Sequence, residues 1–234
     1  MVFGIFAAIG SAISSFVGTV GSAIVGIGSQ IASAISSALP SIGSTISSWV
    51  DKLSTCLGSI VEAVITAVEV VGKLLGIIPQ EMSVEELGAR AMDNPELEAD
   101  DFETYDEYIK ALVEAEFDKE IIEKATDGEK AAFALGGTVI SSIATEEKLR
   151  MSISIDFWVN CTKGNMSGEN MLDLLNSLKA NNISDAGSFS EFLQGEEIED
   201  SEQMSDIEAA ISDYESKDAV QPISDVIANI ENSK

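Results

Sequence analysis

GSAISSFVGTV (residues 10–20) opens a pattern that returns every eleven residues, as GSAIVGIGSQI (21–31), ASAISSALPSI (32–42), GSTISSWVDKL (43–53), STCLGSIVEAV (54–64) and ITAVEVVGKLL (65–75). The fourth place is always Ile, Leu or Val, and the second is always Ser or Thr. Eleven residues make about three turns of an α-helix, so each place returns to the same side of the helix. The pattern predicts a helix over residues 10–75. It argues against a strand or an amyloid-like stack, which needs a period of two.

One side of this helix is expected to be an apolar stripe. Places four, eight and eleven of the unit fall on it, and place seven lies at its edge. The candidate membrane or assembly stripe, including Phe6 from the apolar residues before the repeat, is Phe6, Ile13, Phe16, Val17, Val20, Ile24, Ile27, Ile31, Ile35, Ile42, Ile46, Trp49, Leu53, Leu57, Ile60 and Val64. Small residues beside a stripe let neighbouring helices approach closely. These close-packing candidates are Gly10, Gly21, Ala32 and Gly43.

Pro40 is the candidate hinge of the repeat. Proline lacks a backbone N–H and its ring clashes with the preceding turn, so it kinks or breaks a helix. One straight helix over the segment would be roughly 110 Å long. Residues 1–78 can therefore form one long helix or a hairpin broken at Pro40, and the sequence leaves both open. Gly76 and Pro79 end the segment.

The apolar side of the repeat is too large to stay wet in a lone helix. Its burial is worth roughly 20–45 kcal/mol of transfer free energy as an upper bound. No charged residue precedes Asp51, and the other side of the helix carries Ser, Thr and Gly. A helix that binds anionic lipid by charge would carry Lys or Arg. The stripe is expected to pack on itself, on other copies, on the rest of the chain or on lipid.

The charge of the chain is very unevenly distributed. Residues 1–80 hold three of the 40 acidic and two of the 13 basic residues, so nearly all of the net charge of −27 lies in residues 81–234. An acidic body of this kind repels phosphates, and we expect no direct binding of nucleic acid. The sequence thus divides into an arm that is uncharged up to Asp51 and nearly neutral overall, residues 1–78, and an acidic helical domain, residues 79–234.

No group of residues in the chain suggests catalysis. There is no histidine, which removes the usual bases for Ser or Cys nucleophiles and the commonest zinc ligand. Cys56 and Cys161 form no motif, and acidic pairs such as Asp100-Asp101 lack the spacing of a calcium loop. We expect no enzyme activity, no cofactor and no metal.

Residues 79–234 are expected to form a compact domain of short capped helices, which makes the whole chain all-α. Ser83 and Glu86 form a capping box that opens a helix to about Met92. Further helices are expected at 102–116, 119–124, 128–143, 167–178, 188–193, 205–214 and 223–230, with another element starting at Thr145. Residues 151–159 can be helix or strand. Residues 81–234 are expected to fold alone as a helical monomer.

MVFGIFAAIGSAISSFVG (1–18) resembles the hydrophobic Gly/Ala/Ser/Ile N-termini of phage DNA-pilot and ejection proteins. The longer repeat is similar in style to helical stretches of tape-measure proteins. The resemblance covers residues 1–75 and is one of composition and period, which segments of pore-forming toxins share. It implies a segment that assembles into tubes or enters the target-cell membrane during genome delivery.

Two functions fit these features. One is a membrane-active delivery or pore protein that inserts its arm as an oligomer, with other copies of itself and a lipid bilayer as partners. The alternative is a structural tube, plug or scaffold of a phage or other particle, with other structural proteins as partners and no membrane activity. The N-terminus lacks the basic residues of a secretion signal. We therefore expect a particle-associated protein, or one exported without a cleaved signal, that then meets a target membrane.

Overall fold

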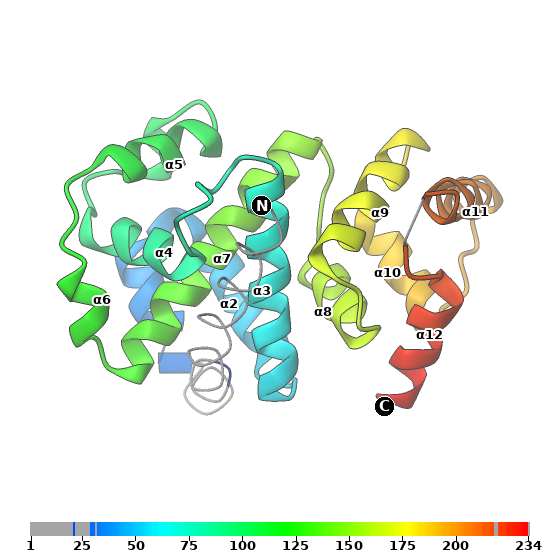
Figure 1. Cartoon of the computed structure of the whole chain (residues 1–234), viewed down its shortest axis with the longest axis horizontal. Coiled ribbons are helices and arrows are strands. Elements are labelled where there is room, and N and C mark those ends of the chain that lie inside the picture. The colour runs from blue at the N-terminus through cyan, green and yellow to red at the C-terminus, as the bar shows by residue number, and fades with distance from the viewer. Residues whose placement is uncertain (1–20, 22–28, 31, 218–219, 234) are drawn as a thin grey trace, which may run out of the picture. The chain divides into compact units, whose positions relative to one another are not determined.

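In the computed structural model, the described residues (21, 29–30, 32–217 and 220–233) form helices joined by short connections (Figure 1). Within these ranges there is no β-strand, only an isolated bridge between Ser152 and Asp185. The all-α class is confirmed. In chain order the elements are η1 (Pro40–Ile42), α2 (Gly43–Leu53), α3 (Gly58–Leu74), α4 (Val84–Asp93), η2 (Ala99–Asp101), α5 (Tyr105–Glu114), α6 (Glu120–Lys124), α7 (Asp127–Leu149), α8 (Ile155–Lys163), α9 (Gly168–Ala180), α10 (Ala186–Gln194), α11 (Ser201–Glu215) and α12 (Ile223–Asn232).

The chain forms two compact units that do not follow the predicted boundary after residue 78. Among the described residues, unit 1 combines those up to 66 with 80–140, and unit 2 combines 67–79 with those from 141 onward. Each unit therefore contains part of the repeat and part of the acidic sequence. Residues 81–234 alone would lack part of the core of both units. We therefore no longer expect residues 81–234 to fold independently as a helical monomer.

In unit 1, the helix starts follow local hydrogen bonding. The Ser83 hydroxyl accepts a hydrogen bond from the Glu86 N–H (3.1 Å), so the predicted N-cap of α4 is confirmed. Thr104 caps α5 in the same way, through the Glu107 N–H (3.3 Å). Both helices carry acidic residues in their first turn, where they interact favourably with the helix dipole.

Helix α4 and the first part of α7, both in unit 1, meet backbone to backbone. A Cβ atom on Gly88 would lie 1.9 Å from the carbonyl oxygen of Phe133, and one on Gly137 would lie 1.8 Å from that of Val84. Only glycine fits at this crossing. The Gly136-Gly137 pair therefore marks close helix packing and not a kink, because α7 runs unbroken from Asp127 to Leu149.

The predicted start of a new element at Thr145 is wrong, because Thr145 lies inside α7. Its hydroxyl donates to the carbonyl oxygen of Ser141 (2.8 Å), one helical turn earlier. A buried threonine used in this way supports a helix interior, whereas an N-cap hydroxyl would accept from a later N–H. Sequence alone does not distinguish the two uses.

Arg90 joins α4 to the end of α5. Its Nη1 donates to the carbonyl oxygens of Leu112, Val113 and Ala115 at 3.1–3.2 Å, which are otherwise unsatisfied at a helix end. Its Nε and Nη2 donate to Glu86 Oε1 at 3.1 and 3.0 Å. Both side chains of this ion pair are largely buried, with exposures of 11% and 14%.

We expect Arg90→Met to lower the free energy of unfolding of unit 1 by about 2–4 kcal/mol, because it leaves a buried carboxylate and three carbonyl groups without their donor. Lys110→Met is the matched control. Lys110 pairs with Asp106 at the surface, and its loss should cost less than about 0.5 kcal/mol. Urea unfolding followed by Trp49 fluorescence in a Trp158→Phe background would measure both. Equal effects of the two variants would contradict the anchoring role of Arg90.

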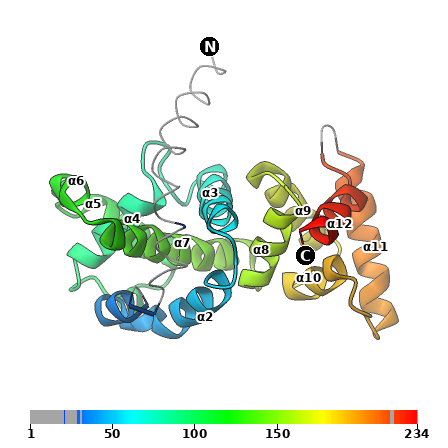
Figure 2. The same cartoon turned by 90° about the horizontal axis from the view of Figure 1, so that it is seen from below.

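Unit 2 consists mainly of α8 to α12, with α12 packed against both α8 and α10 and α9 packed against α11 (Figures 1 and 2). Its core contains Trp158, which is fully buried and whose Nε1 donates to the Ser142 hydroxyl at 3.1 Å. Asn160 is also buried, and it donates to the Ser190 hydroxyl at 2.6 Å. These two hydrogen bonds lower the cost of placing the Trp158 and Asn160 side chains among apolar ones.

Residues 67–79 supply the part of the repeat that belongs to unit 2. A Cβ atom on Gly72 would lie 2.6 Å from the Ser141 hydroxyl oxygen, and one on Gly168 would lie 2.7 Å from Cβ of Val70. The end of α3 therefore approaches α7 and α9 closely. Glu69 is 7% exposed, and its carboxylate pairs with Lys73 at 2.6 Å.

The sequence of residues 151–159 is compatible with a helix or a strand, and the structure contains a short extended stretch followed by a helix. The Ser152 N–H donates to the carbonyl of Ser184, and the Ala186 N–H donates to that of Ser152, so the chain is extended here. Helix α8 then begins at Ile155 with Ser154 as its N-cap.

The start of α11 also differs from the prediction. It begins at Ser201, capped by Asp200, and the predicted start at Ser205 lies inside the helix. The Asp200 carboxylate accepts from the N–H groups of Glu202 and Gln203, which makes it the more effective cap. The predicted start of α9 after Ser167 is confirmed.

Glu146, near the end of α7, is a half-buried carboxyl group in unit 2. Burial raises its pKa to about 7. The nearby charge of Asp185 adds to the increase, and a hydrogen bond from the Ile153 N–H opposes it. Because the folded state holds this proton more tightly than the unfolded chain, Glu146 stabilises the fold most below about pH 4.5. That contribution is lost as the pH rises to about 7.

We expect Glu146→Gln to remove this contribution to the pH dependence. Relative to wild type, the variant should gain about 1–2 kcal/mol between pH 4.5 and 8, after allowance for solvent screening of a half-buried group. Urea unfolding followed by Trp158 fluorescence in a Trp49→Phe background would measure it. Glu191→Gln, at an exposed position of α10, controls for the loss of one carboxylate. A difference from wild type that is the same at both pH values would contradict the prediction.

Candidate functional site

The stripe residues that the structure describes lie mostly inside unit 1. Six of them are 0–4% exposed: Ile35, Ile42, Ile46, Trp49, Leu53 and Val64. Ile60 is half-buried, and the Ser side of the repeat, with Ser33 and Ser44, is exposed. The apolar side is covered by the chain itself: a Cβ atom on Gly136 of α7 would lie 3.8 Å from both Ile35 and Leu39.

The placement of Leu57 on the stripe is wrong, because its side chain is 75% exposed. Helix α2 ends at Leu53, α3 begins at Gly58, and Leu57 lies in the turn between them. The hydroxyls of Ser54 and Thr55 donate to the carbonyl oxygens of Asp51 and Lys52 at 3.0 and 2.7 Å. These local bonds satisfy the end of α2 in place of helix continuation. One continuous helix over residues 10–75 is therefore also wrong.

The chain turns back at Pro40. The helix before it ends at Ala38, Leu39 is non-helical, and a short 3₁₀ turn leads into α2. The Ser36 hydroxyl donates to the carbonyl oxygen of Gly43 at 3.4 Å, whereas in a straight helix residues seven apart are separated by about 10.5 Å. Of the two open alternatives, a break at Pro40 holds for this part of the repeat.

The close-packing candidates give a mixed result. A Cβ atom on Gly21 would lie 2.4 Å from the carbonyl oxygen of Gly58, and one on Gly43 would lie 3.3 Å from Cβ of Ser36. Both positions are thus in close contact with another part of the repeat. Ala32 is half-buried. The remaining sequence-predicted positions lie outside the described residues: Phe6, Gly10, Ile13, Phe16, Val17, Val20, Ile24, Ile27 and Ile31.

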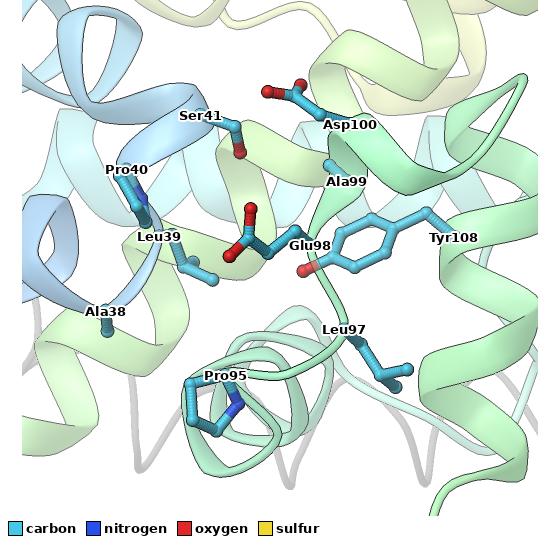
Figure 3. A pocket seen from close by; sticks show the side chains of 10 residues that line it. All are labelled: Ala38, Leu39, Pro40, Ser41, Pro95, Leu97, Glu98, Ala99, Asp100 and Tyr108. Carbon is cyan, nitrogen blue, oxygen red and sulfur yellow. The ribbon is translucent and has the colours of Figure 1, made fainter.

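A pocket of about 270 Å³ lies in unit 1 at the Pro40 turn (Figure 3). Residues 38–41 form one wall, residues 95 and 97–100 form the other, and Tyr108 of α5 completes the lining. We call it the Pro40 pocket. Its polar groups include the carboxylates of Glu98 and Asp100 and the hydroxyl of Tyr108.

Sequence reasoning did not find the Pro40 pocket. Its walls are more than fifty residues apart in the chain, and only folding brings them together. The only signals in the sequence are Pro40 itself and the dense acidic stretch around Asp100, which lacks the spacing of a calcium loop. Burial, and to a smaller extent the charge of Tyr105, raises the pKa of Tyr108. The hydroxyl therefore remains protonated at neutral pH.

Over the described part of the chain, no helix is both long and apolar enough to cross a membrane. The same residues contain no group of three or more Cys, Asp or Glu side chains placed to hold a metal ion. Comparison of the chain with protein-family models, with curated proteins and with solved structures finds no match.

Leu53 and Leu57 offer a direct test of where the repeat is buried. Leu53→Ala should lower the free energy of unfolding of unit 1 by about 2–4 kcal/mol, because it leaves a cavity in the core. Leu57→Ala should change it by less than about 0.5 kcal/mol, because this side chain is in solvent. Urea unfolding followed by Trp49 fluorescence measures both. A large cost at Leu57 would indicate that other copies cover it.

Proposed function

We propose that this chain is a membrane-active delivery or pore protein whose repeat enters lipid as an oligomer. The described fold is then a shielded form, in which unit 1 covers part of the stripe. The observation that carries the proposal is the contrast between the two sides of the repeat. Its apolar residues from Ile35 to Leu53 are fully buried, while its exposed side before Asp51 has only uncharged residues. Before Asp51, this part of the repeat has no charged side chain that would have to give up its hydration when it moves from unit 1 into lipid.

The size of the buried stripe sets the condition for release. Six buried stripe residues contribute roughly 9–18 kcal/mol as an upper bound, about as much as the whole stability of a typical domain. The repeat therefore leaves unit 1 only when another apolar environment replaces the lost contacts. Lipid and the stripes of other copies both provide one. Insertion is thus coupled to opening of unit 1.

A purely structural role is the second candidate, and one observation favours it. The stripe residues are already covered within the chain, and Gly21 and Gly43 lie in close contacts typical of permanent helix packing. In this case the protein is a component of a tube, plug or scaffold, and its partners are other copies or other proteins of a particle. For both candidates we propose no catalytic role. The net charge of −27 also opposes direct contact with nucleic acid.

Dye release from phosphatidylcholine vesicles would separate the two candidates. We expect release by the wild-type chain, and more release by Gly137→Ala, which disrupts the α4–α7 crossing and loosens unit 1 without changing the repeat. Ile46→Lys also disrupts unit 1 but places a charge on the stripe. Dye release by Ile46→Lys should be at least roughly tenfold lower than that by Gly137→Ala, since a charge in lipid costs about 2.5–3.5 kcal/mol per helix. Ser47→Lys adds the same charge at the exposed neighbouring position and should resemble wild type.

The outcomes distinguish the proposal from simple unfolding. If release followed unfolding alone, Ile46→Lys would leak as much as Gly137→Ala, and the proposal would fail. If neither wild type nor Gly137→Ala released dye at any concentration, the structural role would be favoured. Native mass spectrometry on the same samples would show whether release accompanies oligomerisation.

A further inference from the structure

The Pro40 pocket contains a buried hydroxyl group that has no hydrogen-bond partner among the described residues. Tyr108 is only 1% exposed, and its hydroxyl makes no hydrogen bond to any residue that the structure describes. Burying a hydroxyl without a partner is unfavourable, unless the hydroxyl faces an opening that water or a ligand can fill. Figure 3 shows this hydroxyl directed into the pocket, beside the carboxylate of Glu98.

The charged groups of the pocket are all of one sign. Glu98 and Asp100 both line it, both are exposed, and neither forms an ion pair with a described residue. Further carboxylates follow at Asp101 and Glu103 in the same stretch. The local field therefore favours a cation. Apart from the Ser41 hydroxyl, the remaining walls are apolar, formed by two leucines, two prolines and two alanines.

The residues that line the pocket, and their packing, indicate which class of cation it can bind. The described residues contain no group of three or more Cys, Asp or Glu side chains placed to hold a metal ion, and a hydrated metal ion would gain nothing from apolar walls. A quaternary ammonium group is recognised by free aromatic faces. Here the Tyr108 ring already packs against Phe102 and Tyr105, with centroids 5.6 and 6.0 Å away. A primary ammonium group instead donates hydrogen bonds, which the carboxylate and the hydroxyl oxygen can accept.

We propose that the Pro40 pocket binds a primary alkylammonium group. The ammonium head lies between Glu98 and the Tyr108 hydroxyl, and a short alkyl chain lies along Leu39 and Pro40. At about 270 Å³ the pocket is slightly smaller than typical ligand sites of roughly 300 Å³ and more, so the alkyl chain is short. The site joins the turn of the repeat to the acidic stretch of unit 1, and it does not depend on the proposed membrane function.

Fluorine NMR of the full chain labelled with 3-fluorotyrosine would test this directly. The chain has three tyrosines, which give three signals assignable with Tyr→Phe variants. On addition of n-butylammonium chloride at constant ionic strength, the Tyr108 signal should shift in a saturable way, with a Kd in the millimolar range. Tyr214, in unit 2, should not shift. The neutral analogue n-butanol should bind about tenfold more weakly, because it lacks the charge-assisted hydrogen bond.

Two variants with the same change in net charge give the matched comparison. Glu98→Gln should weaken n-butylammonium binding about tenfold. Glu96→Gln, also exposed but not lining the pocket, should change it less than about twofold. Both positions are exposed, so the fold should be retained.

Four results would overturn the proposal. Equal binding of n-butanol would indicate an apolar crevice, and equal effects of the two variants would indicate diffuse charge attraction. Tighter binding of choline than of n-butylammonium would indicate a quaternary ammonium site. No saturable shift up to about 100 mM would indicate that there is no site.

Discussion

The apolar side of the eleven-residue repeat must be removed from water, and the rest of the described fold follows from how this is achieved. Ile35, Ile46 and Leu53 have no exposed surface, and no charge on the same segment before Asp51 could hold it at an aqueous surface. A straight helix rises about 1.5 Å per residue and cannot bury its own stripe. The breaks at Pro40 and at residues 54–57 shorten the helices, so the rest of the chain can cover them.

The acidic residues support this arrangement chiefly at helix starts. Carboxylates occupy the first turn of α4, α5, α7, α9 and α11, where they interact favourably with the helix dipole, and Asp200 and Asp185 act as N-caps. With 40 acidic and 13 basic residues, most carboxylates have no basic residue available to pair with. The few cations therefore carry specific tasks. Arg90 is the clearest case, because it satisfies both a buried carboxylate and the end of α5.

The Pro40 turn links the proposed function and the proposed ligand site. The same break that shortens the repeat places residues 38–41 opposite the acidic stretch around Glu98, and the pocket lies between them (Figure 3). A ligand bound there would contact both the turn of the repeat and the acidic stretch opposite it. Under the membrane proposal, such a ligand would favour the shielded form, because it binds only when the two walls are together. Under the structural proposal, it would stabilise the folded component.

The sequence by itself determined the features that depend on neighbouring residues. The N-caps at Ser83 and Ser167 and the all-α class follow from local hydrogen bonding and backbone sterics, which a few adjacent residues decide. The sequence also marked Pro40 as the possible hinge, but it left a straight helix and a break there both open. Tertiary structure decided which parts of the chain cover the repeat, and it divided the repeat between two units. An apolar stripe requires burial, but it does not specify the partner that buries it. The same holds for Leu57, which fits the eleven-residue pattern but lies in a turn, and for the Pro40 pocket, whose walls only folding brings together.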